Sequence, residues 1–173
     1  MTGNNHSEAG DQGNASRDFW SSYEFDRSYA GSLPKRAWNR LRGHQNQLIS
    51  LSEVKQQVNV AGQHDKGMAT VPVASITGSE GRSQEFNDRF QPLQKHSKRR
   101  WISIAAAQQQ GKILPPVDLI KVGQVYFVRD GHHRVSVANE VGQMEIDAHV
   151  SEWDVACPIE FRRPELAKVC QAV

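Results

Sequence analysis

The sequence predicts an α+β domain with a small mixed sheet and helices toward its N-terminal side. Four runs rich in β-branched and apolar residues read as strands, at residues 68–76, 117–121, 125–129 and 144–150. Two stretches with apolar residues at helical spacing, 97–110 and 135–141, lie between them. The order is therefore helices, strand, helix, hairpin, helix, strand, which is typical of a small α+β or mixed-sheet domain.

Composition narrows the class of protein. The 173 residues suit one domain with extensions, and the net charge of +2 excludes a polycation that would coat nucleic acid. Residues 1–33 are net negative, so the remainder is more basic than the average and leaves room for an anionic ligand. Cys157 and Cys170 lie far apart without a CxxC spacing, which argues for reduced thiols. Without a signal peptide or a long apolar run, we expect a cytoplasmic protein that does not bind membranes.

Four segments are expected along the chain. Residues 1–33 are rich in Gly, Ser, Asn and Asp and predict a disordered tail. Residues 34–66 predict a helical extension, because Pro34 suits a first helical turn and "SLSE" from Ser50 reads as a capping box. Residues 67–153 hold the sheet domain, and 154–173 form a C-terminal tail.

The elements of the sheet domain follow from local signals. The first strand, 68–76, leads into a glycine-bearing loop at 77–83 and then a partly helical connection broken at Pro92. Ser97 and Gly111 bound the next helix. Gly123 allows a hairpin turn between two strands, and the following helix ends near Gly142.

A basic run, "KHSKRR", surrounds the start of the helix after Ser97. Cations near a helix N-terminus are unfavourable by about 0.3–1 kcal/mol each. Lys95, Lys98, Arg99 and Arg100 therefore form either a solvated basic surface or one side of a site for an anion.

The stretch "RDGHHRVSVA" carries the strongest functional signal. A strand, a glycine and a helix in succession form phosphate-binding geometry, because Gly131 allows close approach and the helix start presents unpaired N–H groups. Arg134 adds a forked donor suited to phosphate oxygens. In the alternative, Asp130 caps the helix and the histidines lie on the surface. Adjacent residues project about 100° apart, so a metal site on His132 and His133 is not expected.

Residues 114–153, with "PPVDL", "YFV" and "DGHHR", resemble the ParB/sulfiredoxin superfamily, in particular bacterial ParB-like nuclease domain proteins. His132 stands where sulfiredoxins carry their nucleophilic cysteine, so sulfinic acid reduction is not expected. Partitioning ParB proteins read Gly-Glu-Arg-Arg here, and only Gly131 and Arg134 match. The resemblance to ParB-like free-serine kinases, which share Asp-Gly-His-His-Arg and use a glutamate base, implies that role for Glu80.

We therefore expect a ParB/sulfiredoxin-like domain that binds a nucleotide, such as ATP with Mg²⁺, or another phosphorylated ligand. We expect Gly131 to cradle phosphate, Arg134 to clamp it, and His132 and His133 to donate hydrogen bonds. Asp130 is expected to orient the turn or to hold Mg²⁺ indirectly.

Ser79 and Arg82 are expected to close over the ligand from the first loop. Phosphoryl transfer or hydrolysis would then use Glu80 and His133 as catalytic groups. The alternative is a DNA-binding or nuclease-like module related to chromosome partitioning, with "KHSKRR" and "FRRPELAK" as contacts. The sequence leaves the oligomeric state open.

Overall fold

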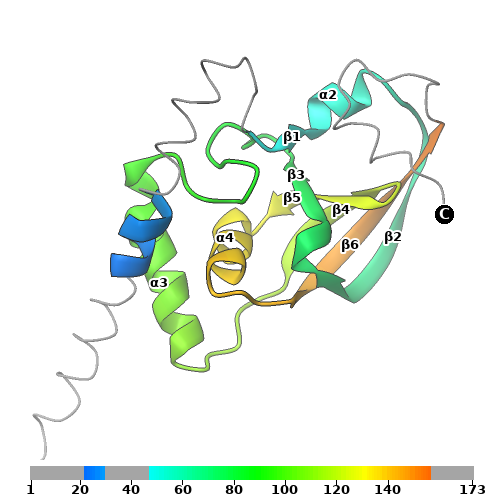
Figure 1. The fold of residues 1–173 in the computed structure, drawn as a ribbon. Coiled ribbons are helices and arrows are strands. Elements are labelled where there is room, and N and C mark those ends of the chain that lie inside the picture. Colours follow the sequence, from blue (N-terminus) through cyan, green and yellow to red (C-terminus); the bar gives the residue numbers. More distant parts are fainter. Residues whose placement is uncertain (1–21, 30–46, 157–173) are drawn as a thin grey trace, which may run out of the picture.

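A six-stranded mixed sheet lies at the centre of the protein (Figure 1), in a computed structural model that describes residues 22–29 and 47–156. The strand order is β1-β3-β5-β4-β6-β2. The strands are β1 (Ile49–Ser50), β2 (Asn59–Pro72), β3 (Ile76–Ser79), β4 (Val117–Val122), β5 (Val125–Asp130) and β6 (Glu145–Ala156). The helices are α2 (Leu51–Lys55), α3 (Lys98–Gln109), α4 (His132–Glu140) and two 3-10 turns, η1 (Val73–Ser75) and η2 (Lys95–Ser97). The predicted α+β class with a mixed sheet is confirmed.

Apolar side chains pack on both faces of the sheet. Consecutive residues of a strand point to opposite faces, and Leu119 and Ile120 of β4 accordingly belong to two different clusters. One cluster joins the sheet to Val135 of α4, and the other joins it to Leu51 and Val54 of α2. Each face is thus covered by a helix, and α4 is fixed in place by its burial.

The strand directions bring the carboxyl ends of two strands to one edge of the sheet. β4 and β5 form the expected antiparallel hairpin, whereas β3 and β5 run parallel. The carboxyl ends of β3 and β5 therefore lie side by side, and ligand sites in mixed and parallel sheets gather at such edges. The loop after Ser79 and the turn after Asp130 meet there.

The first predicted strand is wrong in its bounds. The sequence favoured 68–76, but β2 covers 59–72, and a 3-10 turn separates it from β3. β2 pairs with β6 from Asn59 opposite Ala156 to Pro72 opposite Glu145, so β6 also outlasts its predicted end. Most of β2 is exposed, and its central residues 62–67 are glycines and polar residues, which hid the strand signal. β2 consequently crosses the expected boundary between residues 66 and 67.

Two local expectations near the sheet are also wrong. Residues 80–94 form turns instead of a partly helical connection. They are organised by the buried Asn87, whose side-chain Oδ1 accepts from the backbone N–H groups of Arg89 and Gln91. α2 starts as expected after Ser50, but the side chain of Ser50 makes no capping hydrogen bond. The hydroxyl of Ser50 pairs instead with that of Ser52, at 2.7 Å.

The expected disorder is wrong for residues 22–29, which form a helix beside α3 (Figure 1). Phe25 is 1% exposed and packs edge-on against Trp101, with ring centroids 5.7 Å apart. Asp26 pairs with Lys98 of α3 at 2.8 Å, and Arg27 pairs with Glu140 of α4 at 2.9 Å. One apolar anchor and two ion pairs thus hold this segment on both helices.

The remaining expectations for the ends of the chain, including the helix after Pro34 and the two cysteines, lie outside the described residues. Within 22–29 and 47–156, no helix is both long and apolar enough to cross a membrane.

The burial of Phe25 gives a first prediction. Phe25→Ala removes a fully packed ring from between α3 and α4, and such truncations cost about 3–5 kcal/mol. Urea unfolding should show this loss, whereas Tyr23→Ala, at a side chain that is 55% exposed, should change stability by about 0.5 kcal/mol or less. Equal, small effects of both substitutions would show that the helix does not pack as described.

Candidate functional site

Gly131 creates the turn between β5 and α4. Its φ is +96°, a left-handed conformation that side-chain-bearing residues rarely adopt. A Cβ at this position would lie 2.6 Å from a methyl carbon of Val117, the first residue of β4. The glycine is therefore required twice, for its backbone angle and for its contact with β4.

No side chain caps the N-terminus of α4. The alternative in which Asp130 caps this helix is therefore wrong. The first N–H groups of a helix lack partners within it and carry a partial positive charge, so they form a place for negative charge. This feature alone is common to many helices, and the side chains around it decide what it can bind.

His132 is buried and paired. It is 4% exposed, its ring stacks on Phe86 with centroids 5.9 Å apart, and its Nε2 lies 2.7 Å from the hydroxyl of Ser79. The same hydroxyl oxygen accepts the N–H of Arg82. This contact ties the turn to the loop after β3. Because Ser79 is fully buried, it holds the histidine in position and cannot be reached as a nucleophile.

His133 is buried without a partner for its Nε2. Only 6% of the residue is exposed, its ring packs edge-on against Phe86, and Nε2 has no hydrogen-bond partner. An unpaired polar atom in such a place costs about 1–3 kcal/mol. The alternative with both histidines on the surface is therefore wrong, and the Nε2 atom suits a ligand that would complete its hydrogen bonding.

A small cavity lies at this turn. It is about 20 Å³ in volume, room for one water-sized group. Its lining residues are Arg82, Arg100, Ile104, Asp130, Gly131, His132, His133 and Arg134. Arg82 reaches it from the loop after β3 and Arg100 from α3, so three cationic side chains from three elements surround it.

Burial and these cations keep both histidines neutral. Desolvation, followed by the charge of Arg82, lowers the pKa of His132 to about 4. Desolvation, followed by the charges of Arg100 and Arg82, lowers the pKa of His133 to about 4. An anion in the cavity would oppose the arginine charges, so this site favours a negatively charged ligand.

Arg134 binds the protein itself. One terminal nitrogen donates to the carbonyl oxygens of Pro115, at 2.6 Å, and Pro116, at 2.5 Å, and the other donates to Asp130 at 2.7 Å. Most of its donors are thus used to fix the segment before β4 and the start of the turn. Its charge still faces the cavity, but the expected forked clamp on phosphate would require these bonds to be exchanged.

The expected site residues are brought together except for one. Ser79, Arg82 and residues 130–134 surround or support the cavity. The carboxylate of Glu80 instead pairs with Arg129 at 2.9 Å, on an exposed surface outside the cavity lining.

Two residues of this site, Phe86 and Ile104, were missed, and Arg100 was expected only as one cation of the basic run. Arg100 stood in the basic run, but only the packing of α3 on α4 brings it to the turn. Phe86 and Ile104 gave no functional signal in the sequence. Of the other cations in the run, Lys98 pairs with Asp26 and Arg99 is exposed, so the run serves as both solvated surface and cavity wall.

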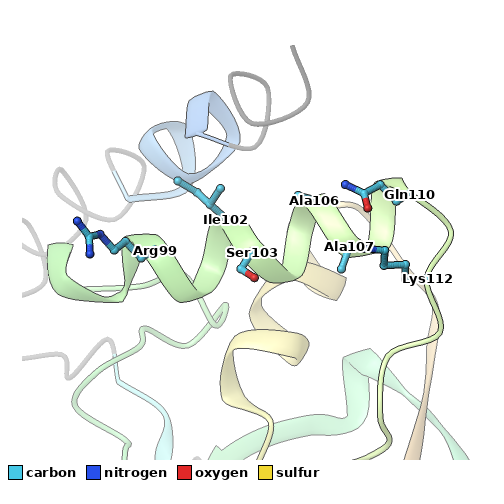
Figure 2. A pocket seen from close by; sticks show the side chains of 7 residues that line it. All are labelled: Arg99, Ile102, Ser103, Ala106, Ala107, Gln110 and Lys112. Carbon is cyan, nitrogen blue, oxygen red and sulfur yellow. The ribbon is translucent and has the colours of Figure 1, made fainter. Parts of the chain in front are cut away.

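A larger hollow of about 520 Å³ lies on another face of α3 (Figure 2), between Arg99 and Lys112. Ser103, Ala106 and Ala107 form the middle of its wall, and Ile102 points toward the helix over residues 22–29. It contains no histidine and no residue of the turn, so its size does not make it the chemical site.

The cavity fits an anion better than a resident metal ion. Asp130 is its one carboxylate, and that carboxylate already pairs with Arg134. In the described part of the chain, no three His, Cys, Asp or Glu side chains gather as metal ligands. Mg²⁺ prefers several oxygen ligands, which the side chains lining this cavity do not supply.

The described residues thus define an α+β protein with an arginine-lined cavity at a strand–glycine–helix turn. Neither a scan against protein-family models nor a search of curated proteins gives a match. Among solved structures, the chain is similar to sulfiredoxin from Arabidopsis thaliana, with a TM-score of 0.37 and 17% identity. The alignment covers 48% of this chain and 82% of that chain. This likeness is distant, and we take neither family nor activity from it.

Gly131 needs a left-handed backbone angle and a close contact with Val117, so we expect Gly131→Ala to lower the stability of the fold strongly. The left-handed angle costs about 1–2 kcal/mol for a side-chain-bearing residue, and the clash with Val117 adds about 1–3 kcal/mol. Gly142→Ala is the matched control, because Gly142 has a φ of +71° with no atom near the added Cβ. Denaturant unfolding should show the greater loss for Gly131→Ala, and equal losses would argue against the contact with β4.

The lowered histidine pKa values predict acid sensitivity. In the unfolded chain the histidines regain a pKa near 6.5. Between about pH 6.5 and pH 4 the unfolded chain therefore binds more protons than the folded protein does. Stability should be full above about pH 6.5 and fall as the pH is lowered through this window, by on the order of 2 kcal/mol for each histidine.

Urea unfolding at about pH 7 and about pH 4.5 measures this loss. His133→Gln should make stability less dependent on pH, because it removes one of the two buried imidazoles. An unaltered pH dependence in His133→Gln would contradict the assignment.

Proposed function

We propose that the turn over residues 130–134 binds the phosphate group of a nucleotide or of another phosphorylated small molecule. The observation that carries this proposal is the buried, unpartnered Nε2 of His133 in a cavity flanked by Arg82 and Arg100. The finer assignment, a ParB-like protein with nucleotide-dependent chemistry, rests on the sequence resemblance.

The size of the cavity determines how a phosphate would sit. A space of about 20 Å³ admits one phosphate oxygen, which the N–H groups at the start of α4 and the Nε2 of His133 can reach. The other oxygens would lie at the mouth, where Arg82 and Arg100 are exposed enough to turn toward them. Charge-assisted hydrogen bonds from these side chains would supply most of the affinity.

Phosphoryl transfer or hydrolysis at this turn is the chemistry we propose for the bound nucleotide. His133 is neutral at pH 7, so it can accept a proton or, in the tautomer protonated at Nε2, donate one hydrogen bond. Glu80 could act as the catalytic base only after leaving Arg129. The protein would contribute chiefly position and charge neutralisation.

DNA binding stays a prediction of the sequence. In the basic run, Lys98 is paired with Asp26 and Lys95 lies over the ring of Tyr29, which leaves Arg99 and Arg100 as the cations able to meet a phosphate backbone. A titration with duplex DNA tests this alternative, because backbone contacts predict a steep loss of binding with salt.

Arg99 and Arg100 provide a matched test of the phosphate site. Both lie in the first turn of α3, but only Arg100 lines the cavity. Calorimetric titration with ATP, with and without Mg²⁺, should show that Arg100→Gln lowers affinity about tenfold or more, since a charged hydrogen bond contributes about 1.5–3 kcal/mol.

Arg99→Gln removes the same charge from the other side of the helix and should change affinity by about twofold or less. Equal losses in both variants would indicate diffuse attraction to a basic surface. Absence of binding by both ATP and tripolyphosphate would overturn the phosphate site itself.

A further inference from the structure

A second hollow, of about 390 Å³, lies where α3 ends and β4 begins. Its apolar wall is formed by Ile113, Leu114 and Pro115 on one side and Ile146 of β6 on the other. Ile113 is 98% exposed, the most exposed large apolar side chain among the described residues. An exposed apolar wall beside a charged cavity suggests a binding surface more than a packing defect.

The hollow lies next to the cavity at the turn, because Arg134 lines both spaces. On α3, Ile104 lines the cavity and Gln108 lines the hollow, and residues four apart lie on one face of a helix. A ligand anchored at the turn would reach the hollow by passing Arg134 along this face of α3.

The hollow is held in a fixed shape. The carbonyl oxygens of Pro115 and Pro116 accept from Arg134, which fixes the segment next to Ile113. On the opposite side, the amide of Gln108 donates to the side chain of Gln143 at 2.8 Å, and Gln143 donates to the carbonyl oxygen of Glu145. The chain therefore builds this surface before a ligand arrives.

The chemistry of the wall suits a flat group with polar edges. Ile113, Leu114 and Pro115 offer apolar contact, while Gln108 and Lys112 place polar groups nearby. The guanidinium of Arg134 is held in place at the junction, and guanidinium planes stack readily on aromatic rings. An inorganic polyphosphate would make neither the apolar contacts nor the stacking contact.

We propose that this hollow binds the base of a nucleoside phosphate whose phosphate group lies at the turn. The inference rests on the proposed function and deepens it, because it predicts selection of a nucleotide over a phosphate chain alone. The base lies against Ile113, Leu114 and Pro115, and the sugar passes Arg134.

Four ribonucleoside triphosphates and tripolyphosphate, titrated into the full chain by calorimetry, test this proposal. At least one nucleotide should bind about tenfold more tightly than tripolyphosphate. Ile113→Ser should weaken that nucleotide about tenfold and leave tripolyphosphate unchanged, because burying a side chain of this size supplies such a factor. Ile113 packs against little else, so the variant is expected to fold, and a thermal melt verifies this.

Met68→Ser is the matched control, since Met68 is a second exposed apolar side chain, 61% accessible and located on β2. Met68→Ser should change neither the affinity for the nucleotide nor the affinity for tripolyphosphate.

Tripolyphosphate binding as tightly as every nucleotide, or Ile113→Ser weakening both probes alike, would overturn the base site and leave the phosphate site standing. A change in sedimentation of Ile113→Ser without a change in nucleotide affinity would assign the surface to a protein partner and also overturn the proposal. Failure of every probe to bind would overturn both the phosphate site and the base site.

Discussion

The close approach of Gly131 to Val117 is the contact on which the site depends. The turn between β5 and α4 lies directly against the first residue of β4, and only a residue without a Cβ fits there in the left-handed conformation. α4 consequently starts deep in the protein, with its first two side chains directed at Phe86 and away from solvent. Histidines at the start of a helix would ordinarily be exposed to solvent. Here the backbone geometry makes them neutral and buried.

The charged side chains around the turn are mostly positive. Two desolvated imidazoles lie among Arg82, Arg100 and Arg134, and the single carboxylate that lines the cavity belongs to Asp130. Such an arrangement does not maximise stability, because it buries polar atoms and gathers like charges. Departures of this kind from local rules concentrate at functional sites, where a ligand supplies the missing partner. An anion would neutralise the arginines and also complete the hydrogen bonding of His133.

Local patterns were sufficient for the elements nearest the site. The hairpin of β4 and β5 and the start of α4 follow from β-branched runs and glycines at tight turns, signals that depend on neighbours in the chain. β2 was not predicted over its full length because its stability comes from pairing with β6, whereas most of its side chains are exposed and do not alternate between apolar and polar. The helix over residues 22–29 was not predicted, because one buried ring, Phe25, holds it on elements far along the chain. Arg100 was visible as a cation, but its position over the turn is a property of helix packing.

Arg134 connects these observations. A guanidinium that bonds two backbone carbonyls and a carboxylate is a structural side chain, and it fixes the segment 115–116 to the turn. The same side chain forms part of the wall of both the cavity and the hollow beside it. Any ligand that draws Arg134 toward a phosphate would loosen its bonds to Pro115 and Pro116 and so change the shape of the hollow. The two parts of the proposed site are therefore coupled through one residue, and affinity for phosphate and shape of the neighbouring surface cannot vary independently.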